Sequence, residues 1–104
     1  MTFDLGTTLK EMLGAARDSL GKDWTKVQKV MQRVLQDEKQ ALESIAAARI
    51  NGEIDDKELA GQLTDEKEAL AAGLDMVEAV KKASLQRAVD AALNVFKKAL
   101  QKAL

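Results

Sequence analysis

Histidine and cysteine are both absent from this chain of 104 residues. Histidine is the commonest general base and metal ligand in proteins, and cysteine supplies disulfides, thiol nucleophiles and thiolate metal ligands. The serines at positions 19, 44 and 84 therefore have no histidine that could activate them as nucleophiles. We expect no catalytic residue, no metal site and no cofactor, and hence a protein that is not an enzyme.

Proline and tyrosine are also absent, and the only aromatic residues are Phe3, Trp24 and Phe96. Alanine and leucine dominate the apolar residues, a composition that favours helices and is poor in residues that form strands. The sequence therefore predicts an all-α protein: residues 1–104 form a single helical domain, an antiparallel bundle of three or four helices with a long second and a long C-terminal helix.

Long apolar runs are missing as well, since no stretch approaches the roughly 20 residues needed to span a bilayer. Near its N-terminus the sequence has Phe3, Asp4 and Leu5 where a signal peptide would have a basic region followed by an apolar one. We therefore expect a cytoplasmic location.

The clearest local signal is a helix corner at residues 50–59. Gly52 can take the left-handed conformation that ends a helix, and Asn51 beside it tolerates the same conformation. Residues 52–59 also resemble the short helical-hairpin segments of SHOCT-type bacterial proteins, which implies a helical hairpin here and no catalytic residue. The chain is predicted to reverse its direction at this point.

A new helix is predicted to start directly after this corner. Asp55 can cap it with its side-chain oxygen, while Glu58, three residues later, can bond back to the cap amide. Ile54 and Leu59 occupy the two positions of a hydrophobic staple, an apolar contact that sets the direction of the chain into the helix.

Similar signals predict the other helices. Thr8, with Glu11 three residues later, predicts a first helix over about 8–20 that ends before Gly21. Asp23 is the expected cap of a helix over about 24–50, which carries the most regular apolar stripe.

After the corner, the pattern fits helices over about 56–72 and 76–103. A stop at Gly73, with Asp75 and Glu78 starting the next helix, is as compatible with the sequence as one continuous helix.

Glu38 is the one acidic residue on the apolar stripe of the predicted 24–50 helix. We expect its carboxylate to pair with a lysine or arginine, or to reach water at the edge of the stripe. Glu66 on the following helix could also approach it, so a carboxylate metal site is a weaker alternative.

Charge is distributed unevenly along the chain although the net charge is −1. Residues 53–80 carry two basic and nine acidic side chains, whereas residues 81–104 carry six basic side chains and one acidic side chain. We expect the acidic segment to orient the basic tail by electrostatic attraction.

The basic tail is also the strongest candidate for a binding surface. Its apolar face provides five expected interaction anchors: Leu85, Val89, Leu93, Phe96 and Leu100. Trp24, at the start of the predicted 24–50 helix, is a sixth candidate. The chain is predicted to be a non-enzymatic interaction or assembly protein, a homo-oligomer or the partner of another helical protein.

The alternative is a peripheral membrane protein that binds through the basic amphipathic helix 81–104. Nucleic acid is not an expected partner, because the chain lacks both a basic net charge and the aromatics that stack on bases.

Overall fold

The computed structural model describes residues 3–104, and within this range it contains helices and no strand. The prediction of an all-α bundle is confirmed. The α-helices are α1 (Leu5–Leu20), α2 (Trp24–Asp37), α3 (Lys39–Ile50), α4 (Asp56–Gly73) and α5 (Lys82–Ala103), and a short 3₁₀ turn, Gly21–Asp23, connects α1 to α2.

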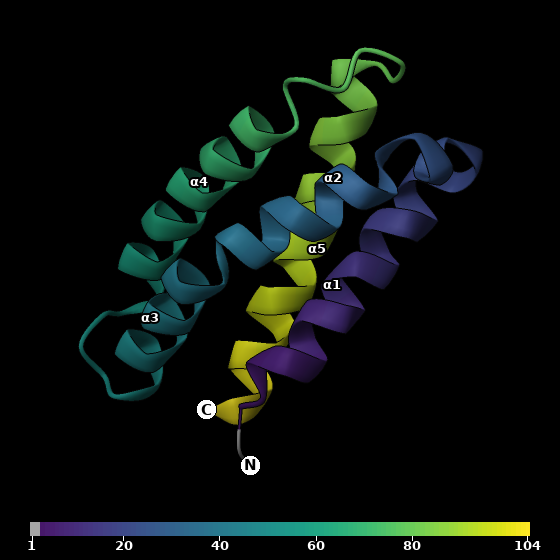
Figure 1. The fold of residues 1–104 in the computed structure, drawn as a ribbon. Helices are drawn as coiled ribbons and strands as arrows, with labels where there is room; N and C mark the ends of the chain where they lie inside the picture. Colours follow the sequence, from purple (N-terminus) through teal and green to yellow (C-terminus); the bar gives the residue numbers. More distant parts are fainter. Residues whose placement is uncertain (1–2) are drawn as a thin grey trace.

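Helices α1 and α5, the first and last of the chain, lie side by side along most of their length and form the most extensive contact in the molecule (Figure 1). Helix α2 crosses this pair, and α3 and α4 form a hairpin in which α4 packs against α5 on the side away from α1. The resulting bundle measures 41 × 23 × 19 Å. The start of α1 and the end of α5 meet at the same end of the bundle.

Helix α1 begins at Leu5, one turn earlier than the sequence predicted. Its cap is Asp4, whose carboxylate accepts hydrogen bonds from the backbone N–H of Thr7 at 3.4 Å and from the Thr7 hydroxyl at 2.8 Å. The hydroxyl of Thr8, the expected cap, instead donates to the Asp4 carbonyl at 2.8 Å. The prediction failed because Asp4 and Thr8, one helical turn apart, are both residues that can cap a helix.

Asp23 does not cap α2, contrary to the prediction. The 3₁₀ turn places Asp23 in the helical region, at φ −77° and ψ −8°, where its side chain cannot reach the first amides of the helix. Its carboxylate lies 3.4 Å from Lys26 Nζ instead. Gly21, at φ 58°, ends α1 as the sequence predicted.

The single helix predicted over 24–50 is divided in two at Glu38. This residue takes φ −92° and ψ 4°, and the chain continues as α3 in a new direction. No proline or glycine lies at this kink, which explains why the sequence did not reveal it.

The corner after α3 agrees with the prediction in detail. Gly52 has φ 76°, and its N–H donates to the Arg49 carbonyl while the N–H of Glu53 donates to the Ala48 carbonyl at 2.8 Å. These two bonds form a Schellman motif, which uses the last carbonyls of α3. Asn51 adopts an ordinary right-handed conformation, so Gly52 alone provides the left-handed residue.

The start of α4 also follows the prediction. The Asp55 carboxylate accepts from the Glu58 N–H at 2.8 Å, and Glu58 accepts from the Asp55 N–H at 3.2 Å, which completes a capping box. Leu59 is buried and Ile54 packs at the edge of the core, as expected for a staple.

The structure resolves the alternatives at Gly73 in favour of a break, since α4 ends at this residue. A Cβ atom at Gly73 would lie 2.8 Å from Val34 Cγ2, so the glycine allows α4 to approach α2 closely. The next helix starts at Lys82 and not near 76, because Val77 and Val80 turn inward from the connection and leave Asp75 and Glu78 exposed.

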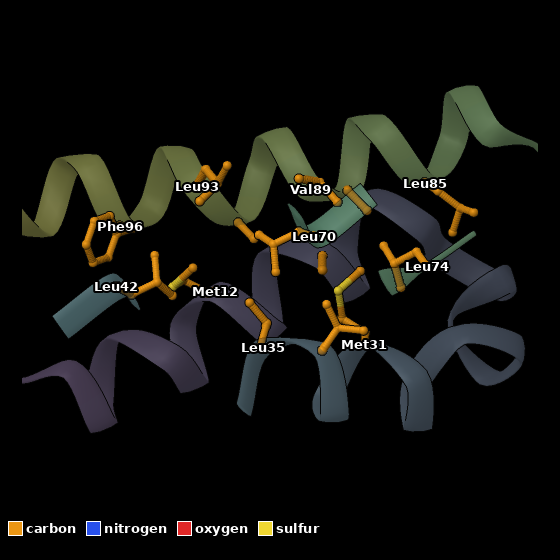
Figure 2. Close-up of a cluster of buried hydrophobic side chains, with 14 of the residues drawn as sticks. Met12, Met31, Leu35, Leu42, Leu70, Leu74, Leu85, Val89, Leu93 and Phe96 are labelled. Atoms are coloured by element: carbon orange, nitrogen blue, oxygen red, sulfur yellow. The ribbon is translucent and has the colours of Figure 1, made fainter. Parts of the chain in front are cut away.

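One hydrophobic core joins all five helices. Figure 2 shows Phe96, Leu93, Val89 and Leu85 of α5 directed toward Met12, Leu42, Leu70 and other apolar side chains of the remaining helices. The largest buried side chain is Phe96, whose ring meets Phe3 edge to face at a centroid distance of 5.8 Å.

Candidate functional site

The five side chains expected to be interaction anchors are buried within the single chain. Leu85, Val89, Leu93, Phe96 and Leu100 form the inner face of α5. Helix α1 is the main element that covers α5, and Trp24 lies half-buried at the edge of the same core. A partner that binds the folded bundle therefore has to use other residues.

The basic side chains of the tail lie on the outside of the bundle, whereas its apolar stripe faces inward. No helix of the part of the chain described here is long and apolar enough to cross a membrane. A membrane-bound α5 would have to leave the core in order to insert its apolar side chains.

The expected attraction between the acidic segment and the basic tail is limited to one exposed ion pair, Lys82–Asp75, at 3.4 Å. A second pair between these segments has the opposite polarity, since Lys67 of the acidic segment binds Asp90 of the tail at 2.9 Å. Exposed ion pairs contribute roughly 0–1 kcal/mol each, so they assist the contact between helices but do not determine it.

An apolar hollow remains at the end of the bundle where α1 begins and α5 ends. We call it the terminal groove. Its volume is about 910 Å³, and its apolar lining comes from three helices and the segment before α1: Phe3, Leu5, Gly6, Ala46, Ala47, Ile50 and Ala103. The acidic side chains Asp4 and Glu43 complete the lining.

One exposed large apolar side chain lines this groove. Among the described residues the large exposed ones are Ile50, Met76 and Leu104, with exposed fractions of 41%, 64% and 58%. Ile50 lines the groove, Leu104 directly follows the lining residue Ala103, and Met76 lies in the α4–α5 connection. Ile50 is therefore the exposed large apolar side chain that a partner in the groove would bury.

Basic side chains lie beyond the groove on the α5 side. A neighbouring hollow shares Phe3, Asp4 and Ala103 with the terminal groove and is lined by Lys98 and Lys102. Glu43 thus lies on the α3 side of the groove, and the two lysines lie in the neighbouring hollow on the α5 side, which Glu11 of α1 also lines. Sequence patterns do not reveal this surface, because its residues come from segments that only the fold brings together.

Glu38 and Glu66 form a second unusual feature, in the middle of the contact between α4 and the α2–α3 kink. Glu66 is buried, and the neighbouring carboxyl group of Glu38 contributes to raising its pKa. Of the two arrangements expected for Glu38, pairing with a lysine or arginine is not found among the described residues, and the half-buried position of Glu38 agrees with the other, an edge of the stripe. The possible approach of Glu66 is confirmed.

Residues 3–104 contain no group of three or more acidic side chains placed to hold a metal ion together. Comparison with protein-family models, curated proteins and solved structures gave no match to this chain. The function therefore has to be argued from the surfaces themselves.

Proposed function

We propose that this chain is a non-enzymatic assembly protein, in which two copies pair through the terminal groove. The observation that carries the proposal is the exposure of Ile50, a large apolar side chain that lines the apolar hollow together with Phe3 and Leu5. Full burial of such a side chain contributes roughly 1.5–3 kcal/mol, before the ordering costs of association.

A second copy of the chain suits this surface because its charges are self-complementary. In a two-fold symmetric pair, each patch contacts the same patch of the other copy in the reverse direction. The acidic α3 side of one groove, with Glu43, would then face the basic α5 side of the other, with Lys98 and Lys102. Such complementarity sets the orientation of a complex and speeds its formation.

The proposal is tested by measuring the solution mass of the full chain with light scattering after size exclusion, over a series of concentrations. We expect the wild type to form dimers and Ile50→Asp to raise the dissociation constant at least tenfold, because a carboxylate would be buried at the interface. Met76→Asp is the matched control, since it places the same charge on the exposed α4–α5 connection.

Charge reversal gives an independent test of the orientation. We expect Glu43→Lys and Lys102→Glu each to weaken the dimer, and the double variant to restore much of the affinity. A wild type that is monomeric at every concentration would overturn the proposal, as would an Ile50→Asp variant that dimerises as well as the wild type.

A further inference from the structure

Glu66 is a buried acid with an incomplete set of hydrogen bonds. It lies on the inner face of α4 between Leu59 and Leu70, and only 7% of its surface is exposed. Its Oε2 atom is buried and has no hydrogen-bond partner among the described residues. An ionised carboxylate in this position would lack both water and a donor, so the site favours the protonated form.

The neighbours of Glu66 strengthen this preference. Burial is the main cause that raises the pKa of Glu66, from 4.5 to about 7, and the carboxyl group of Glu38 and the charge of Asp65 raise it further. The adjacent Lys67 binds Asp90 of α5 at 2.9 Å. The two charged neighbours that shift the pKa of Glu66, Glu38 and Asp65, are both acidic.

Apart from Lys39, the cations on the helices packed against α4 have other partners or are exposed. On α2 and α3, Arg33 donates to the sulfur of Met76 at 3.3 Å, and Arg49 binds Asp56 at 2.9 Å. Asp37 is exposed beside Glu38, Lys39 is half-buried, and the α5 side chains Arg87 and Lys97 are exposed.

Glu38 is also the residue at which the chain changes direction between α2 and α3. The contact between this kinked arm and α4 is held on one side by the close approach of Gly73 to Val34 and on the other by the Arg49–Asp56 ion pair. Glu38 and Glu66 lie between these two contacts along the helices. Repulsion between their carboxyl groups would therefore push the kink away from α4.

We propose that Glu38 and Glu66 form a proton-binding site, which holds the α2–α3 kink against α4 while the two carboxyl groups share one proton. In this state the O–H of one carboxyl group donates to a carboxylate oxygen of the other. Loss of the proton leaves two negative charges facing each other without a donor, and the kink moves away from α4 to admit water.

The direction of the pH dependence follows from the raised pKa. The folded protein binds this proton more tightly than the unfolded chain, so the site favours folding fully below pH 4.5. That contribution is lost as the pH rises from 4.5 to about 7 and is absent above this range. The expected loss is about a hundredfold in the folding equilibrium constant.

The first experiment is an NMR titration of the full chain that follows the Glu66 carboxyl carbon and the backbone amides of residues 34–42. We expect Glu66 to titrate near pH 7 and the amides to shift with the same midpoint. Glu66→Gln should abolish the amide shifts, whereas Glu68→Gln, an exposed acid on the same helix, should leave them unchanged.

The second experiment measures denaturant unfolding of the same three proteins between pH 4.5 and 8. Glu66→Gln should lose most of the hundredfold pH dependence that the wild type and Glu68→Gln retain. A Glu66 carboxyl that titrates near 4.5, or amides that do not follow it, would overturn the proposal. So would a titration midpoint that moves when EDTA is added, since the ligand would then be a metal ion. None of these results depends on whether the chain dimerises.

Discussion

Gly61 and Gly73 both lie in α4, but the residues around them give them opposite roles. A Cβ atom at Gly61 would have nothing within 4 Å, whereas one at Gly73 would lie 2.8 Å and 2.9 Å from the two methyl carbons of Val34. Neither glycine has a positive φ. The difference between them is therefore one of packing and not of backbone conformation.

Substitution of each glycine by alanine should separate these two roles. We expect Gly73→Ala to lower the free energy of unfolding by about 1–3 kcal/mol, because the new methyl group collides with Val34. Gly61→Ala should raise it by about 1 kcal/mol, because alanine is the better helix former and the space is open. Urea denaturation with an unchanged m-value measures both effects.

Val34 provides the control for this comparison. Adding Val34→Ala to Gly73→Ala should recover part of the loss, as expected for two residues in contact. If Gly73→Ala were as stabilising as Gly61→Ala, the close approach of α4 to α2 would be wrong.

The acid pair shows how far sequence patterns can predict a single residue. The stripe position of Glu38 correctly predicted that this acid faces neighbouring helices. Its partner depends on which turn of α4 lies opposite the kink, and that register is set by packing contacts such as Gly73 against Val34. No local pattern contains this information.

At the scale of the element, helix ends that depend on local sequence were predicted correctly, and helix ends that depend on packing were not. The capping box at Asp55 and the turn at Gly52 were predicted correctly because every atom involved lies within a few residues. The start predicted near residue 76 was wrong. Val77 and Val80 of the connection pack against the core, and α5 begins only after them, at Lys82. The kink at Glu38 was missed because nothing in the local sequence breaks the helix.

Two aspartates that look alike in the sequence should consequently differ in their effect on stability. We expect Asp55→Ala to lower the free energy of unfolding by about 1 kcal/mol, because the Glu58 N–H loses its acceptor. Asp23→Ala should change it by less than about 0.5 kcal/mol, since Asp23 makes only a partly exposed ion pair with Lys26. Thermal and urea unfolding of both variants would measure the difference, and equal losses would mean that Asp23 caps α2 after all.

At the scale of the whole molecule, the main feature is that the first and last helices pack against each other. Helix α1 covers the apolar face of α5 that a sequence argument assigned to a partner. Helices α2, α3 and α4 lie between these two helices in the sequence, so the α1–α5 contact joins segments that are far apart along the chain. Because the apolar face of α5 is covered in this closed arrangement, the proposed partner surface is the terminal groove, where the start of α1 and the end of α5 meet.

This arrangement also predicts that the bundle unfolds as one cooperative unit. Met12 of α1 is completely buried in the core that all helices share. Met12→Ala should therefore lower the free energy of unfolding by about 2–5 kcal/mol, and the most protected amides of α4 and α5 should lose protection by the same amount as those of α1. Native-state hydrogen exchange measures each helix separately, with Met76→Ala as an exposed control. Loss of protection confined to α1 would instead mean that this helix opens by itself, and the face of α5 would then be accessible to a partner.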